Sequence, residues 1–74
     1  MTNNIILNVC TYGARLNMRE SPSANAKILT QLTHAEKVSL IHKRADGWAL
    51  VKLANGKTGW VQERFLIPEN GSAR

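Results

Sequence analysis

The stretch from Gly47 to Leu66, "GWALVKLANGKTGWVQERFL", holds both tryptophans, the only phenylalanine and three of the five glycines of the chain. Two explanations compete for this concentration of scarce residues. They belong to the closing strands of a small barrel, or they line a binding surface. The pattern inside the stretch, and then the pattern on either side of it, shows how far each explanation holds.

Side chains in the first half of this stretch alternate with a period of two, which is typical of a half-buried strand. One predicted face carries Ala49, Val51 and Leu53, and the other carries Trp48, Leu50 and Lys52. The segments Ala45–Gly47 and Asn55–Gly56 flank this strand and are strong hairpin signals, because Asn, Asp and Gly tolerate positive φ. The stretch therefore predicts strands joined by two tight turns.

The rest of the chain extends the same pattern. Further strands are predicted in residues 5–10, 15–19, 27–32 and 37–43, and "ERFL" predicts one helical turn before a last short strand. The best helical candidate, residues 25–38, lacks a sustained 3.6-residue period and is interpreted as strand and connection. We therefore predict an all-β fold: a small barrel of five to six short strands with a long first loop and one short helical turn near the C-terminus.

Length and charge set the outer limits. The 74 residues suit one domain, predicted over residues 1–67, and the polar residues 68–74 are expected to be a disordered tail. The formal net charge of +5 favours anionic partners such as nucleic acid, phospholipid or wall polymers. The basic residues are dispersed along the chain, however, and a dispersed charge is more often a solvated surface.

Catalytic and metal-binding patterns are weak. Cys10 is the only cysteine, so it excludes an internal disulfide and a multi-cysteine metal site. His34 and His42 lie apart, and the acidic residues fall in different loops and ends. "GKT" at residues 56–58 lacks the remaining glycine of a phosphate loop and the following helix, so it is interpreted as hairpin. We expect no catalytic residue, no metal and no cofactor.

Two sequence features bear on localisation. No apolar run reaches the roughly 18 residues that a membrane-spanning helix needs. These residues also contain no signal peptide. The expectation is a monomer that is cytoplasmic as it stands, or located in the cell wall if it is part of a larger exported protein.

Two motifs resemble the bacterial Src-homology-3 domain, the SH3b family. "RLNMRESPS", residues 15–23, is similar to the family's Leu-Asn-Val-Arg-x-x-Pro signature. "DGWALVKLANGKTGWV", residues 46–61, is similar to Gly-Trp-x-x-Val-x-x-x-Asn-Gly-x-x-Gly-Trp-Val. The resemblance runs from about Leu7 to Ile67 and departs at Ala35, where the family usually carries Gly, so another turn type is expected there. It implies a small β-barrel that binds without catalysing, often beside cell-wall hydrolases.

The candidate binding residues surround the loop from Glu20 to Ala26, which Pro22 stiffens. Loops held on a rigid scaffold often carry recognition. Asn17 and Arg19 lead into this loop, and they either contact a ligand or tie the loop's own carbonyl groups. The predicted ligand-binding set is Tyr12, Asn17, Arg19, Glu20, Ser21, Pro22, Trp48 and Trp60.

The rings in this set have alternative interpretations. Trp48 is expected to be partly a lid on the core and partly an exposed platform. Trp60 either packs over the end of the barrel or borders the groove. Tyr12 is expected to offer a hydroxyl beside the Glu20–Ala26 loop. His42 is interpreted as a histidine at the end of a strand rather than a ligand-binding residue.

The leading functional hypothesis is a module that binds peptidoglycan peptides of the bacterial wall. The alternative is an intracellular or phage-encoded protein that binds a protein partner as an adaptor or inhibitor. Nucleic acid is a third and weaker hypothesis, since small barrels can stack bases on aromatic rings. A basic proline-rich ligand is disfavoured for two reasons. The loop offers a single acidic residue, Glu20, to meet a basic ligand. In addition, Gln62 and Phe65 stand where eukaryotic relatives place Pro and Tyr.

Overall fold

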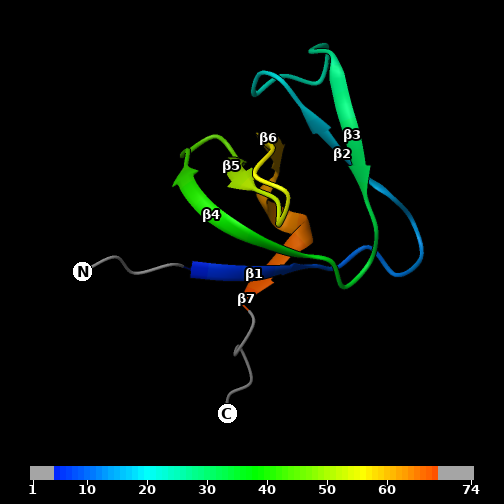
Figure 1. Cartoon of the computed structure of the whole chain (residues 1–74). Coiled ribbons are helices and arrows are strands. Elements are labelled where there is room, and N and C mark those ends of the chain that lie inside the picture. Colours follow the sequence, from blue (N-terminus) through cyan, green and yellow to red (C-terminus); the bar gives the residue numbers. More distant parts are fainter. Residues whose placement is uncertain (1–4, 69–74) are drawn as a thin grey trace.

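The computed structural model describes residues 5–68, which form one antiparallel sheet (Figure 1). The strands follow the order β3-β2-β6-β5-β4-β1-β7 across the sheet. The elements are β1 Ile5–Val9, β2 Leu16–Arg19, β3 Ile28–Leu32, β4 Lys37–Lys43, β5 Trp48–Lys52, β6 Thr58–Gln62, the 3-10 helix η1 Glu63–Phe65 and β7 Leu66–Pro68.

The predicted all-β fold is confirmed, with two differences in detail. The described chain has seven strands rather than five to six, because β7 is a separate three-residue strand that pairs with β1. Pro68, which the sequence assigns to the tail, is the last residue of β7. The other tail residues, 69–74, lie outside the described residues.

Both predicted turns join neighbouring strands of the β4-β5-β6 meander. Gly47 and Gly56 adopt φ angles of 97° and 90°, which favour glycine because it has no Cβ. The sequence also suggests positive φ at Asn55, but Asn55 does not have a positive φ in the structure. Its side-chain oxygen instead accepts the backbone N–H of Lys57 at 2.9 Å. An Asx turn therefore replaces the expected pair of left-handed residues.

One core lies inside the curved sheet. The fully buried side chains come from six strands, β1 to β6, and they include Val9, Met18, Leu32, Val38, Val51 and Val61. The predicted inner face of Ala49, Val51 and Leu53 is confirmed as buried. Because side chains alternate along a strand, burying this face leaves Trp48, Leu50 and Trp60 on the outer surface of β5 and β6.

The side chain of Met18 packs closely against the backbone of Gly59 in this core. A Cβ built on Gly59 would come within 2.5 Å of Cγ and 3.0 Å of Sδ of Met18, which is fully buried. The bare backbone of β6 thus leaves the space that the Met18 side chain of β2 fills. Strands β2 and β6 pair at one position, Arg19 with Trp60. The β2–β3 hairpin is therefore held to the meander mainly by side-chain packing at this contact rather than by a long series of backbone hydrogen bonds.

The turn between β3 and β4 keeps a geometry that suits glycine although it carries Ala35. Ala35 has a φ of 75°, and its N–H donates to the carbonyl oxygen of Val9 at 2.6 Å. Another turn type was expected here, but Ala35 adopts the left-handed φ that glycine would adopt at this position. The left-handed conformation costs a residue with a Cβ about 1–2 kcal/mol.

Ala35→Gly is expected to raise the free energy of unfolding by about 0.5–1 kcal/mol. The gain comes from relief of the left-handed strain, partly offset by the greater freedom of glycine in the unfolded chain. Urea denaturation would measure it. Ala54→Gly is the matched control, because Ala54 sits in a turn without positive φ and should lose stability. Equal losses in the two variants would contradict the assignment of strain to Ala35.

Candidate functional site

The outer surface beside Trp48 is hollowed into two adjoining depressions. One, of about 200 Å³, lies between β2 and η1, and the other, of about 580 Å³, lies beside the turn that precedes β5. They share Trp48, Gln62 and Arg64, so they form one surface. We term it the Trp48 groove; its residues are Arg15, Leu16, Asn17, Arg19, Asp46, Gly47, Trp48, Gln62, Glu63, Arg64, Phe65 and Leu66.

Backbone hydrogen bonds fix Trp48 at the start of β5. Its carbonyl oxygen accepts the N–H of Arg44 at 2.8 Å, and its own N–H donates to the Asp46 carboxylate at 3.3 Å. The Glu63 N–H donates to the Gly47 carbonyl oxygen at 2.8 Å, which attaches η1 to the same turn. The Trp48 side chain is half-buried, in agreement with the expected role as part lid and part platform.

The two acidic residues of the groove are already paired. The Arg44 guanidinium donates three hydrogen bonds to the Asp46 carboxylate, two from Nε at 3.1 Å and one from a terminal nitrogen at 2.8 Å. Glu63 forms an ion pair with Lys43 at 3.1 Å. The hydrogen bond from Arg44 holds the pKa of Asp46 below its usual value of 3.8. Asp46 is therefore ionised at neutral pH, and its charge is compensated locally.

Arg19 has the structural role that the sequence left as one of two options. Its guanidinium donates to the carbonyl oxygen of Ala26 at 2.8 Å, across the base of the Glu20–Ala26 loop. The Glu20 N–H also donates to the Lys27 carbonyl oxygen at 3.0 Å. Arg19 also lines the smaller depression, so the same side chain supports the loop and borders the groove.

Asn17 also lines the smaller depression. Its side-chain oxygen accepts a hydrogen bond from Gln31 of the neighbouring strand β3 at 2.9 Å. Asn17, Arg19 and Trp48 are thus the three members of the predicted set that the structure brings together in one place.

The loop residues of the predicted set lie outside the groove. Glu20 and Ser21 are exposed and Pro22 is half-buried, and none of the three lines either depression. The loop is held by its own short-range bonds, with the N–H of Ser23 donating to the carbonyl oxygen of Ser21 at 2.8 Å. Their part in binding remains a prediction.

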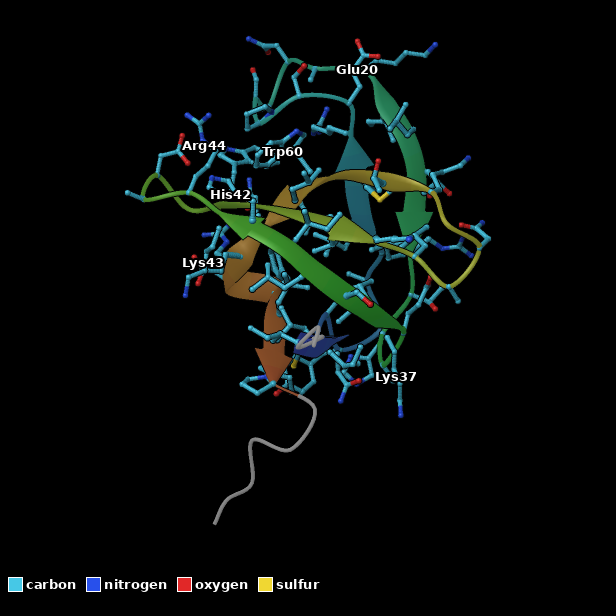
Figure 2. The ribbon with its side chains drawn as sticks, turned by 60° about the vertical axis from the view of Figure 1, so that its left-hand side comes forward. Glu20, Lys37, His42, Lys43, Arg44 and Trp60 are labelled. Atoms are coloured by element: carbon cyan, nitrogen blue, oxygen red, sulfur yellow. The ribbon has the colours of Figure 1, made fainter. Side chains whose placement is uncertain are left out.

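Trp60 lies on the same outer face as Trp48 but has different neighbours. Figure 2 shows it gathered with His42 and Arg44 near the end of β4. The Arg44 guanidinium carbon is 5.9 Å from the ring centroid of Trp60, and the His42 ring meets it edge-on at 6.4 Å. These side chains lie against the ring, and Trp60 does not line the Trp48 groove.

Tyr12 was expected beside the Glu20–Ala26 loop, but the two lie at opposite ends of the β2–β3 hairpin. Leu16 pairs with Leu32 at one end of the β2–β3 hairpin, next to Tyr12, and the Glu20–Ala26 loop closes the other end. Tyr12 is 86% exposed and stacks against His34, with ring centroids 5.4 Å apart. A hydrogen bond with the Cys10 thiol raises the pKa of the Tyr12 hydroxyl.

His34 has a structural role that sequence reasoning missed. Its Nδ1 accepts the backbone N–H groups of Thr11 and Tyr12, each at 3.0 Å. His34 therefore holds the chain after β1 against the turn after β3, and its place in a connection gave no signal of this.

Nine of the twelve groove residues were outside the predicted set, and those in the smaller depression include Arg15, Gln62, Arg64 and Phe65. Arg64 stands 5.0 Å from the centre of the Phe65 ring. The signal that could have found Arg64 and Phe65 is "ERFL", since a helical turn directly after β6 returns its side chains to the Gln62 end of that strand. Arg15 had no comparable local signal.

Two kinds of site receive no support within residues 5–68. No three His, Cys, Asp or Glu side chains of this part of the chain gather as a metal site requires. No helix in the same range is long and apolar enough to cross a bilayer. The chemistry available in the described groove is hydrogen bonding, charge pairing and contact with two aromatic rings.

Comparison with known proteins adds to this geometry. The profile of the bacterial SH3 domain matches residues 14–67. The chain is 43% identical over 51 residues to the probable endopeptidase p60 of Listeria grayi, a match that covers 69% of this chain and 10% of that protein. Over 52 residues, or 70% of this chain, it is 36% identical to two proteins of Bacillus subtilis (strain 168).

The two Bacillus subtilis proteins are the putative N-acetylmuramoyl-L-alanine amidase YrvJ and the cell wall-binding protein YwsB. The match covers 10% of the first and 29% of the second. The chain therefore spans less than a third of each of these relatives.

Proposed function

Because the chain belongs to the bacterial SH3 domain family, which it matches over residues 14–67, we propose that it is a non-catalytic module that binds the bacterial cell wall. The family that the two sequence motifs suggested is thereby confirmed. The bacterial SH3 domain is a binding module, so the activities in the names of p60 and YrvJ belong to parts of those proteins outside the match.

One observation carries the proposal: a similar segment occurs in three proteins whose names describe different roles. One is named an endopeptidase, one an amidase and one a cell wall-binding protein. One of the three is named for binding to the cell wall, which is not a reaction. Attachment to the wall is the function that a shared non-catalytic segment would supply.

The Trp48 groove is the surface that we assign to this function, with peptidoglycan peptide as the ligand. Small ligands bind in concave sites that combine an apolar wall with a few placed polar groups. The groove offers the rings of Trp48 and Phe65 beside the amides of Asn17 and Gln62. Backbone amides of a short peptide can pair with such side-chain amides while small side chains contact the rings.

Co-sedimentation with purified bacterial sacculi tests the proposal. We expect the folded protein to pellet with sacculi at moderate salt and to remain in solution with cellulose, an uncharged polysaccharide that carries no peptide. Circular dichroism would establish that the protein is folded in both samples. A folded protein that stays in the supernatant with sacculi would refute wall binding.

A further inference from the structure

Arginine gathers in the smaller depression of the Trp48 groove. Arg15 precedes β2, Arg19 ends it and Arg64 lies in η1, and all three line the same 200 Å³. Among the described residues, no carboxylate lines this depression. The acidic residues of the groove, Asp46 and Glu63, line the other depression. The groove therefore has a cationic end, although the basic residues are dispersed in the sequence.

These guanidinium groups retain unused donors. A guanidinium has five N–H donors. Within residues 5–68 the Arg15 side chain makes no hydrogen bond or ion pair, and Arg19 makes one, to the Ala26 carbonyl oxygen. Arg64 contacts the face of the Phe65 ring. Stacking of a guanidinium on a ring leaves its in-plane N–H groups available to an anion.

The other polar groups of the depression also suit an acceptor. The Asn17 side-chain oxygen is occupied by Gln31, so the remaining hydrogen-bonding capacity of Asn17 lies mainly in its NH₂ donors. Gln62 adds another amide, and Trp48 and Phe65 supply apolar contact. The set offers several donors and two rings, which matches a peptide that carries a carboxylate better than it matches a sugar-phosphate chain.

We propose that the Trp48 groove recognises a free carboxylate on a peptide, held by Arg15, Arg19 and Arg64, with the peptide running over Trp48. The proposal rests on the proposed function and specifies its ligand. Arginine pairs with carboxylates in a planar two-bond geometry, which gives orientation as well as attraction. The groove thus selects acidic peptides. Eukaryotic relatives have the opposite charge arrangement, in which acidic residues of their loops pair with a basic residue of the peptide ligand.

Chemically altered sacculi separate the sources of negative charge. One sample is untreated, one has its carboxylates converted to amides with carbodiimide and ammonia, and one has lost its phosphate polymers through hydrofluoric acid. We expect amidation to weaken binding about tenfold, the scale of one charge-assisted contact. Removal of phosphate should leave binding unchanged. Binding that survives amidation, or that falls only when phosphate is removed, would overturn the proposal.

Two soluble peptides test the recognition of a free carboxylate without sacculi, and therefore independently of wall binding. The probe is the tripeptide Ala–γ-Glu–Lys with free carboxylates, compared with its fully amidated form. We expect only the acidic form to shift the indole N–H signal of Trp48 in a two-dimensional NMR titration. If the protein binds no sacculi, the proposed function fails, and the peptide pair still decides this inference. Equal shifts, or no shift at millimolar peptide, would overturn it.

Charge-matched variants complete the test. Arg15→Gln and Arg64→Gln remove groove cations, and Lys57→Gln removes one exposed cation at the far end of the β5–β6 hairpin. We expect each arginine variant to bind untreated sacculi about three- to tenfold more weakly and to distinguish them less from amidated sacculi. Lys57→Gln should retain the full discrimination. Equal losses in all three variants would show a general charge effect and refute the groove assignment.

Discussion

Gly59→Val is expected to lower the free energy of unfolding by about 2–3 kcal/mol, as overpacking of a dense core does. The added Cβ alone would overlap the Met18 side chain, with Cγ at 2.5 Å and both Sδ and Cε at 3.0 Å. Met18 is flexible in principle, but it is fully buried, so its displacement forces other core side chains to move. Thermal unfolding should show a midpoint more than about 10 °C lower, given the size of the domain.

Two further variants test the cause of that loss. Gly59→Ala should destabilise in the same direction by a smaller amount, since it adds the Cβ without the branches of valine. Met18→Ala alone should cost about 2–5 kcal/mol through the cavity that it leaves. The double variant Met18→Ala/Gly59→Ala should lose less than the sum of the two changes, because each relieves the other.

An additive double variant would contradict this reading of the β2–β6 contact. Thr58→Val serves as the control for placing a valine on the same strand outside the core, because Thr58 is exposed. Its midpoint should stay within a few degrees of the parent. A Gly59→Val protein that melts with the parent would show that the core accommodates the side chain freely.

Trp48→Ala is expected to weaken binding to sacculi by more than about 1.4 kcal/mol, or tenfold, while the chain remains folded. Trp48 is shared by both depressions of the groove, and its half-buried ring offers the largest apolar surface there. The loss of its packed half should also reduce stability. Binding must therefore be measured on samples whose circular dichroism spectrum matches the parent.

Trp60→Ala provides the matched control for this prediction. Trp60 is the same residue type, is also half-buried and lies on the same outer face, but it contacts Arg44 and His42 instead of lining the groove. We expect it to lose stability and to retain binding within about a factor of two. If Trp48→Ala fails to fold, Trp48→Phe, which keeps a ring, should bind more weakly than Trp60→Phe.

Two outcomes would relocate the site. Folded Trp48→Ala that binds as well as the parent would exclude the groove and leave the Glu20–Ala26 loop as the candidate surface. Stronger loss in Trp60→Ala than in Trp48→Ala would instead favour the ring beside His42 and Arg44. Either result is separable from a stability effect when the fraction of folded protein is measured alongside.

The turns and the inner face of the sheet were accessible from local sequence. Gly47 and Gly56 mark the two hairpins because few other residues adopt their φ angles without strain. The alternation of Ala49, Val51 and Leu53 predicted the buried face because successive side chains of a strand point to opposite sides. These signals act over a few residues, so one chain is enough to read them.

The candidate site was only partly accessible. Asn17, Arg19 and Trp48 were predicted and lie together in the smaller depression, and all three belong to the two motifs that carry the family resemblance. Tyr12 was expected near the Glu20–Ala26 loop, but hairpin pairing of β2 with β3 places the two at opposite ends. Trp60 was a candidate on the basis of its residue type, and only the folded structure shows that Arg44 and His42 lie against its ring.

The sequence by itself determined the all-β class, the two hairpins and the family, because each follows from local conformation or from motif order. Only the tertiary structure decided which side chain fills the space above Gly59, that His34 holds the Thr11–Tyr12 turn, and that Arg15, Arg19 and Arg64 share one depression. The physical reason is distance along the chain. Arg15 and Arg64 are far apart in sequence, and pairing of β2 with β6 brings the segments next to them together, which no local pattern encodes.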